Sequence, residues 1–184
     1  FSVHADLLLD EVEQTDLVII PALSGNLTAA IDANKAMIPW IIEQYNKGAE
    51  VASLCLGAFL FASTGLLDGK KCSTHWGFCN EFRTMFPNVE MVDGSIITDE
   101  QRLYSSGGAN SYWNLLLYLV EKYTDRPTAI LAAKYFAVDI ERDSQAAFML
   151  FNGQRAHEDD TIKQVQAWLE AHYTNKVTVD ELAE

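Results

Sequence analysis

Short β-branched runs alternate along the chain with longer segments whose apolar residues have helical spacing. The runs Asp16 to Ile20 and Val51 to Leu54 predict two buried parallel strands. Helical spacing covers Ala29 to Asn46 and Gly57 to Leu67, and Pro39 predicts a kink or a helix start inside the first of these. This alternation predicts a parallel sheet with helices on its faces.

Beyond Lys70 the pattern becomes mainly helical. The expected elements are a short strand or loop at 72–75, a helix at 76–86, a hairpin within 89–104, and helices at 110–122, 126–136 and 161–172, the last capped by Asp160. Thr178 and Glu181 form a capping box, which predicts another helix start. The sequence stops one turn later, so we expect a fragment of a longer protein.

The residues around Cys55 have the spacing of a nucleophile elbow, which is a sharp turn from a strand into a helix. Ser53 and Gly57 supply small residues two positions before and after the cysteine, as such a turn requires to avoid clashes. The turn would strain Cys55, and the helix start behind it would favour a thiolate. A small cysteine buried in a strand is the alternative interpretation of the same residues.

A cysteine nucleophile needs a base, and His75 is the best candidate in the sequence. Leu56 occupies the position directly after the cysteine, so an adjacent histidine is absent. Packing against Trp76 is the alternative role for His75. Cys72 and Cys79 lack an elbow setting, and we expect them to be packing residues.

Two glycine-containing loops are candidates for completing a ligand pocket. Backbone N–H groups in turns such as Ser24-Gly25 and Gly107-Gly108 bind carboxylates or oxyanions, although simple turn chemistry also explains each loop. Phosphate-binding fingerprints and metal-ligand spacings are absent from the sequence, so we expect no cofactor and no metal. The predicted ligand-binding residues are Ser24, Gly25, Cys55, Leu56, His75, Trp76, Gly107 and Gly108.

Charge and cysteine content narrow the function classes. A formal net charge of −13 at pH 7 would repel a phosphate backbone, so this chain is not expected to hold DNA by itself. Three cysteines, an odd number without zinc-type pairing, fit a reducing cytoplasm better than a disulfide scaffold. The longest apolar run, near 115–120, is too short to span a membrane, so no membrane partner is expected.

Taken in order, these segments resemble a known family. Residues 51–59, 62–69, 73–76 and 105–109 resemble the ThiJ/PfpI-like amidase-type domain of AraC-family transcription regulators, and 142–148 resemble the stretch leading out of that domain. Residues 166–170 and 177–183 resemble the opening of the AraC-type DNA-binding domain. The ordered series is more specific than any one motif.

The resemblance implies a class I glutamine amidotransferase-like fold, a three-layer flavodoxin-like α/β sandwich with a mostly parallel sheet followed by a helical C-terminal segment. It implies a sensor domain at 1–137 that lacks its first strand, a linker at 138–157 and a truncated helix-turn-helix domain at 158–184. A homodimer, a small nitrogen-containing effector and DNA bound through the missing C-terminal domain are the implied partners.

Three hypotheses follow from these features. In the first, a ligand at the Cys55 crevice shifts a conformational equilibrium of a regulator, with the linker as relay. In the second, Cys55 and His75 catalyse an amidase, hydrolase or glyoxalase-like reaction, with the Leu56 N–H stabilising the oxyanion. Leu56 departs from the Cys-His pair of the protease-like branch of this family, and the early-strand glutamate of related enzymes would precede Phe1. A dimerisation module with a vestigial pocket is the third.

Overall fold

The computed structural model describes residues 2, 4–146, 159–172 and 178, and the chain divides into two compact units at the Met149–Leu150 bond. The predicted linker 138–157 spans this division, and its residues 147–157 lie outside the described residues. The helix start predicted from the capping box at Thr178 falls on 179–184 and therefore also lies outside them.

The first unit is built on a four-stranded sheet in the order β1-β2-β6-β5. The parallel strands are β1 (Leu17–Ile20), β2 (Glu50–Leu54) and β6 (Leu103–Ser106), and β5 (Ile97–Glu100) runs antiparallel beside β6. A hairpin is therefore present as predicted, but its turn lies at Gln101-Arg102, residues 98–100 belong to β5, and β6 extends to Ser106. Its two turn residues, Gln101 and Arg102, have φ values of 53° and 72°, which match the twist of a two-residue hairpin.

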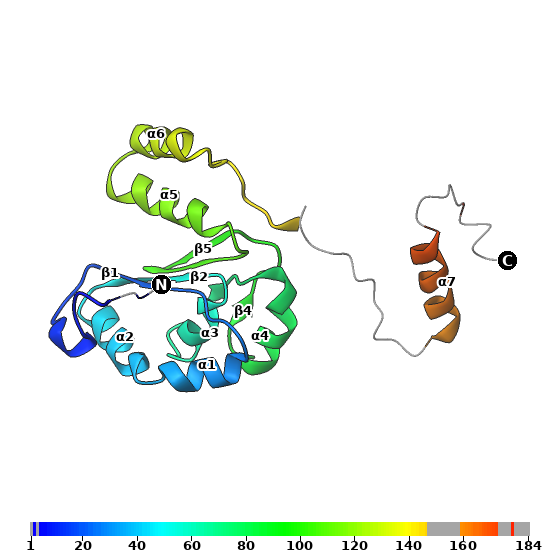
Figure 1. Cartoon of the computed structure of the whole chain (residues 1–184), viewed down its shortest axis with the longest axis horizontal. Coiled ribbons are helices and arrows are strands. Elements are labelled where there is room, and N and C mark those ends of the chain that lie inside the picture. The colour runs from blue at the N-terminus through cyan, green and yellow to red at the C-terminus, as the bar shows by residue number, and fades with distance from the viewer. Residues whose placement is uncertain (1, 3, 147–158, 173–177, 179–184) are drawn as a thin grey trace. The chain divides into compact units, whose positions relative to one another are not determined.

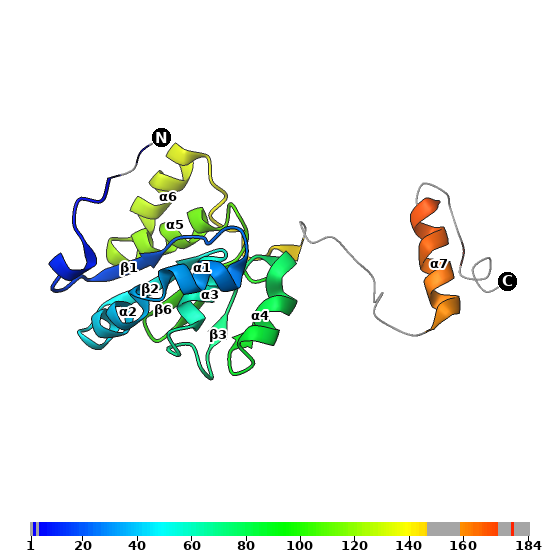
Figure 2. The same cartoon turned by 60° about the horizontal axis from the view of Figure 1, so that its bottom comes forward.

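Helices cover both faces of the sheet (Figures 1 and 2), so the predicted three-layer α/β sandwich is confirmed. One layer holds α5 (Tyr112–Tyr123), which packs on β6, and α6 (Arg126–Phe136), which packs on α5. The opposite layer holds α1 (Leu27–Asn34), α2 (Met37–Asn46), α3 (Gly57–Ala62) and α4 (Cys79–Met85). The short elements are the 3-10 turns η1 (Leu9–Glu11) and η2 (Trp76–Phe78), and a small parallel sheet of β3 (Lys71–Cys72) and β4 (Glu90–Met91).

Three predicted helices differ from the observed ones: the segment 76–86 begins as the 3-10 turn η2 before α4, and the other two differ for local reasons. The segment 29–46 is broken after Asn34 into α1 and α2, and Pro39 is the third residue of α2, where its missing N–H would have no helical partner. Helix α3 ends at Ala62 instead of 67. There Ser63 and Thr64 donate their hydroxyls to backbone carbonyls, and Gly65 has a φ of +75° that ends the helical path.

The sheet is buried on both faces, which explains the continuous apolar runs of its strands. Val51 and Ala52 are both fully buried, but successive side chains of a strand point to opposite faces. Val51 therefore joins the large cluster with Phe59 and Phe82 under α1–α4, whereas Ala52 joins the smaller cluster with Tyr104 under α5.

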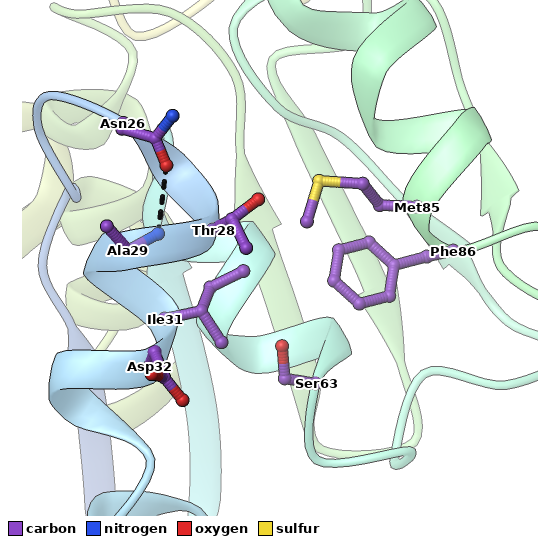
Figure 3. A pocket seen from close by; sticks show the side chains of 8 residues that line it. All are labelled: Asn26, Thr28, Ala29, Ile31, Asp32, Ser63, Met85 and Phe86. Carbon is purple, nitrogen blue, oxygen red and sulfur yellow. Dashed lines mark hydrogen bonds between the residues drawn. The ribbon is translucent and has the colours of Figure 1, made fainter.

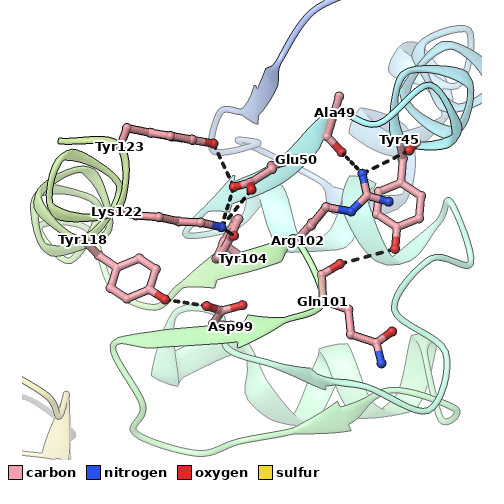
Figure 4. Close-up of polar contacts among 10 residues, drawn as sticks. All are labelled: Tyr45, Ala49, Glu50, Asp99, Gln101, Arg102, Tyr104, Tyr118, Lys122 and Tyr123. Carbon is pink, nitrogen blue, oxygen red and sulfur yellow. Dashed lines mark hydrogen bonds and ion pairs between the residues drawn. The ribbon is translucent and has the colours of Figure 1, made fainter.

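A polar network ties α5 to the edge of the sheet where β2 begins (Figure 4). The Lys122 ammonium donates to both carboxylate oxygens of Glu50 at 2.8 and 2.9 Å and also bonds the Tyr104 hydroxyl. The Tyr123 hydroxyl donates to the same carboxylate at 2.8 Å, and Tyr118 bonds Asp99 nearby. The network satisfies the charge of Glu50, whose side chain is only 15% exposed.

In the second unit the structure describes α7 (Asp160–Ala171), which confirms the predicted helix. Its N-cap is Asp159 and not the predicted Asp160, because the Asp159 carboxylate accepts from the N–H groups of Thr161 and Ile162. Within the described ranges, no helix is long and apolar enough to cross a membrane.

Candidate functional site

The chain turns sharply at Cys55, between the end of β2 and the start of α3. Cys55 has a φ of +52°, in the left-handed region that a side chain with a Cβ rarely adopts. A Cβ on Gly57 would lie 2.5 Å from the Pro21 carbonyl oxygen and 2.6 Å from that of Ile20. The small residue two positions after the cysteine is thus required by contact with the end of β1, and the turn has the conformation of an elbow.

Three separate segments meet at the Cys55 turn. The Cys55 N–H donates to the Ser106 carbonyl at 2.9 Å, and the Thr74 hydroxyl donates to the Cys55 carbonyl at 3.0 Å. The backbone N–H groups of Leu56 and Gly108 lie close enough to the thiol to lower its pKa. These segments follow β2, β3 and β6, and the carboxyl ends of parallel strands are where ligands bind in open α/β sheets. We call this meeting point of the three segments the Cys55 crevice, a name that refers to these residues and not to a measured cavity.

The Gly107-Gly108 loop cannot carry side chains in its present position. A Cβ on Gly107 would lie 2.0 Å from the Gln145 amide nitrogen and 2.6 Å from the Thr74 carbonyl oxygen. Gly108 has a φ of +84°, which only glycine adopts without strain. The absence of side chains lets the loop backbone pack directly against the Gln145 amide and the Thr74 carbonyl.

The thiol of Cys55 is held in its protonated form at neutral pH. Burial raises the pKa of Cys55 above its ordinary value, and the hydrogen bonds from Leu56 and Gly108 lower it by less. The N–H of Leu56, the N-cap of α3, lowers the pKa of Cys55 as expected, but burial of the thiol outweighs this effect, so the helix start does not make the thiolate the favoured form. Cys72 and Cys79 are buried, as expected for packing residues, and burial raises their pKa values to about 12 and 11.

The His75 ring is engaged away from the Cys55 thiol. Its Nδ1 accepts from the Gly77 N–H at 3.1 Å, which makes His75 the N-cap of η2 and places the proton on Nε2 when the ring is neutral. The ring also lies beside Trp76 and Phe78, and burial lowers its pKa. Among the hydrogen bonds of residues 4–146, none joins the His75 ring to Cys55, so its role as a base stays a prediction.

The other predicted ligand-binding residues lie at different depths. Leu56 and Trp76 are half-buried beside the turn, whereas Ser24 and Gly25 are exposed in the loop between β1 and α1. That loop starts at the same sheet edge as the Cys55 crevice, but its observed contact with the elbow runs through Pro21. The structure thus brings Cys55, Leu56 and Gly108 together and leaves Ser24 and Gly25 outside this set.

One buried residue at the site was missed by sequence reasoning. Gln145 is 1% exposed, and its amide nitrogen donates to the carbonyls of Thr74 and Ser95 at 3.1 and 2.8 Å. Its amide oxygen accepts from the Trp76 N–H at 3.4 Å. The residue stands in the stretch 142–148 that resembles the exit from the ThiJ/PfpI-like domain, but that resemblance carries no role for it.

Two cavities lie elsewhere in the first unit, and Cys55 lines neither. A cavity of about 450 Å³ opens between α1 and α4, where Thr28 and Ile31 face Met85 and Phe86 (Figure 3). A second, of about 290 Å³, lies where α5 begins and α6 ends. Among the residues that the structure describes, no group of three or more acidic, histidine or cysteine side chains could hold a metal ion.

Comparison with known proteins gives matches that cover different shares of this chain. GbdR of Pseudomonas aeruginosa, an HTH-type transcriptional regulator, is 25% identical over 180 residues, which are 95% of this chain and 47% of GbdR. The deglycase PH1704 of Pyrococcus horikoshii is 27% identical over 114 residues, or 61% of this chain and 66% of the deglycase. A solved Vibrio parahaemolyticus protein, described as a transcriptional regulator, aligns with a TM-score of 0.68 and 25% identity over 73% of this chain and 71% of its own.

The chain thus spans about half the length of GbdR. Residues 1–122 match the DJ-1/PfpI family, which is about two thirds of the 184 residues and contains the elbow, the Gly107-Gly108 loop and most of α5. The resemblance to a ThiJ/PfpI-like domain is therefore confirmed by sequence, and the sandwich agrees with it in structure. The chain belongs to the DJ-1/PfpI family.

Proposed function

We propose that this chain is the effector-sensing part of a cytoplasmic, AraC-type DNA-binding transcription regulator. The observation that carries the proposal is the length of the chain over which it is similar to GbdR. This similarity covers 180 residues and so continues past residue 122, where the DJ-1/PfpI match ends, whereas the similarity to the deglycase covers 114. The residues beyond the sensor domain thus resemble those of a regulator, and DNA would be bound by a domain that follows this chain.

The Cys55 crevice favours binding over catalysis in this proposal. The backbone N–H groups of Leu56 and Gly108 beside the thiol hold no charge, and a carbonyl or carboxylate oxygen that replaced the thiol as their acceptor would suit them. The thiol is protonated, and the His75 Nδ1 is occupied by Gly77. A small nitrogen-containing metabolite with such an oxygen is the effector that we propose, and the resemblance implies that it acts on a homodimer.

Two experiments test this proposal. A thermal-shift screen of amino acids, betaines and polyamines on the chain should give one class that stabilises it, because a ligand that binds only the native state raises the unfolding temperature. The longer protein that contains the chain should bind promoter DNA with an affinity that this class changes. A longer protein that binds no promoter DNA, with or without these metabolites, would contradict the proposal.

A second candidate function is a cysteine-dependent hydrolase or glyoxalase-like activity, which the elbow at Cys55 and the similarity to a deglycase favour. It requires the His75 ring to leave Gly77 and accept the thiol proton. Turnover of amides or 2-oxoaldehydes that disappears in Cys55→Ser would establish it. Lack of turnover on both classes, together with slow alkylation of Cys55 at neutral pH, would exclude it.

A further inference from the structure

We infer that Gln145 is a positioning residue that couples the Cys55 crevice to the segment through which the chain leaves the first unit. We call residues 138–146 the exit segment. The inference deepens the proposed function, on which its biological meaning rests, because a sensor must transmit the binding of a ligand at the crevice to the rest of the chain. The contacts of Gln145 make this side chain the link between the crevice and the exit segment.

The exit segment is fixed to the first unit by its last described residues. The Gln145 N–H donates to the Gly94 carbonyl at 2.6 Å, and the Ile96 N–H donates to the Asp143 carbonyl at 3.2 Å. Between these two bonds, Ser95 and Ser144 form an antiparallel bridge. The exit segment therefore adds a short strand-like contact to residues 94–96, next to the start of β5.

The Gln145 side chain continues from this bridge into the Cys55 crevice. Its amide bonds the Thr74 and Ser95 carbonyls and the Trp76 N–H, so one buried group joins the exit segment to the loop before η2. A buried amide with these partners is costly to withdraw, because each carbonyl and N–H would lose a hydrogen bond. Seated and withdrawn positions of Gln145 are thus distinct states.

The Gly107-Gly108 loop connects the Gln145 amide to the Cys55 thiol. A Cβ on Gly107 would lie 2.0 Å from the Gln145 amide nitrogen, and one on Gly108 would lie 3.0 Å from its amide oxygen. The same surroundings hold the Cys55 turn, because the Thr74 hydroxyl donates to the Cys55 carbonyl at 3.0 Å and the Cys55 N–H donates to the Ser106 carbonyl at 2.9 Å. Because packed interiors leave no room for a gradual shift, a group at the thiol that displaces Gly108 must also displace Gln145.

The consequence is a reciprocal coupling between the crevice and the exit segment. A ligand that favours one position of the Gly107-Gly108 loop changes the fraction of molecules in which Gln145 is seated. Loss of the Gln145 contacts must in turn change the access to Cys55 by the same coupling. This relation can be measured without knowing the effector.

The test uses iodoacetamide as the probe of the crevice. Alkylation adds a carbamidomethyl group to the Cys55 sulfur. We expect it to speed hydrogen exchange of the backbone N–H groups of Gln145 and Ile96 at least fivefold, because the hydrogen bonds of these two groups hold the exit segment. In Gln145→Ala the backbone N–H groups of residues 145 and 96 should already exchange fast before alkylation, and alkylation should not change their exchange rates. The alkylation rate of Cys55 in this variant should rise several-fold, as measured by peptide mass spectrometry.

Gln44→Ala is the matched control. Gln44 is also 1% exposed, and its amide also bonds backbone groups, namely the Thr15 N–H at 3.0 Å and the Glu13 carbonyl at 3.5 Å. It lies on α2 at the opposite end of the parallel strands. Its loss should lower stability by a similar amount and leave both the alkylation rate and the exchange response unchanged.

Unchanged exchange at Gln145 and Ile96 after alkylation of the unsubstituted protein overturns the inference, and this arm needs no variant to fold. An equal effect of Gln44→Ala on Cys55 alkylation also overturns it, since the effect of Gln145→Ala would then reflect stability alone. The measurement involves neither effector nor DNA. A coupling without DNA binding by the longer protein would contradict the proposed function alone, and regulation without the coupling would contradict this inference alone.

Discussion

Replacing Gly57 with alanine tests the steric basis of the Cys55 turn. Gly57 is the first residue of α3, and its φ is not in the left-handed region, so alanine meets no conformational barrier there. Helix propensity and the smaller entropy of the unfolded chain would make alanine more stable than glycine by about 0.4–1 kcal/mol. The contacts with the carbonyl oxygens of Ile20 and Pro21 predict a change of the opposite sign.

The magnitude follows from how little the neighbours can move. The added Cβ would lie 2.5 and 2.6 Å from two backbone oxygens at the end of β1, and neither can rotate away as a side chain could. Overpacking of this kind costs about 1–3 kcal/mol, and a backbone contact belongs at the upper end of that range. After the favourable contribution is subtracted, we expect a net loss of about 2 kcal/mol in the free energy of unfolding, or about 4–8 °C in Tm.

Urea and thermal unfolding followed by circular dichroism measure this loss. Gly77→Ala is the control, since it also adds a methyl group beside the Cys55 crevice. Its nearest neighbour is the His75 ring nitrogen at 3.3 Å, which a small side-chain rotation can relieve, so its stability should stay within about 0.5 kcal/mol of the parent. A Gly57→Ala protein as stable as the parent, or more stable, would refute the steric account of the elbow.

Three further predictions concern charge. The rate of Cys55 alkylation by iodoacetamide should still rise above pH 9, because burial raises the thiol pKa; a plateau below pH 8 would contradict this. Glu50→Gln should lower the free energy of unfolding at pH 7 by about 1 kcal/mol, a value reduced because Lys122 is 35% exposed. Burial alone raises the pKa of Glu50, but hydrogen bonds from Lys122, Tyr123 and Tyr104 outweigh it, so the net pKa is lowered. The difference in unfolding free energy between the parent and Glu50→Gln should therefore be complete above the unfolded pKa of about 4.3 and vanish as the pH falls through the folded pKa. Urea titrations at several pH values would measure it. The 184-residue chain should not shift DNA in a gel, because even its last 27 residues hold seven acidic residues and two lysines: Glu158, Asp159, Asp160, Glu170, Asp180, Glu181 and Glu184 against Lys163 and Lys176.

Elements with a strong local pattern could be predicted from the sequence. The runs at β1 and β2 are apolar because both faces of the sheet are covered, and the small residues around Cys55 mark the turn between β2 and α3. Pro39 predicted a kink or a helix start within 29–46, and α2 does start close to it, but the exact break after Asn34 was not predicted because the apolar spacing continues through it. Pro39 was noticed, but its place in the first turn of α2 depends on where the preceding helix ends.

The site was predictable only where its residues are neighbours in sequence. Cys55 and Leu56 follow from the elbow pattern, whereas the approach of Gly108 to the thiol depends on the register of β2 against β6. The role of Gln145 depends on partners 50–71 residues earlier in the chain. A lone polar residue in an irregular stretch gives no sign of such contacts, because neither spacing nor composition distinguishes it from a surface glutamine.

The geometry of the Cys55 crevice bears directly on what a sensor there would recognise. The N–H groups of Leu56 and Gly108 lie beside its thiol, and backbone amides keep their dipoles at every physiological pH. The chain around them has a net charge of −13, which repels an anion at a distance. A ligand with balanced charges avoids that repulsion and can still present an oxygen to the two N–H groups. If the proposed function holds, the crevice would favour zwitterionic or neutral carbonyl compounds over simple anions, so these compounds come first in the thermal-shift screen.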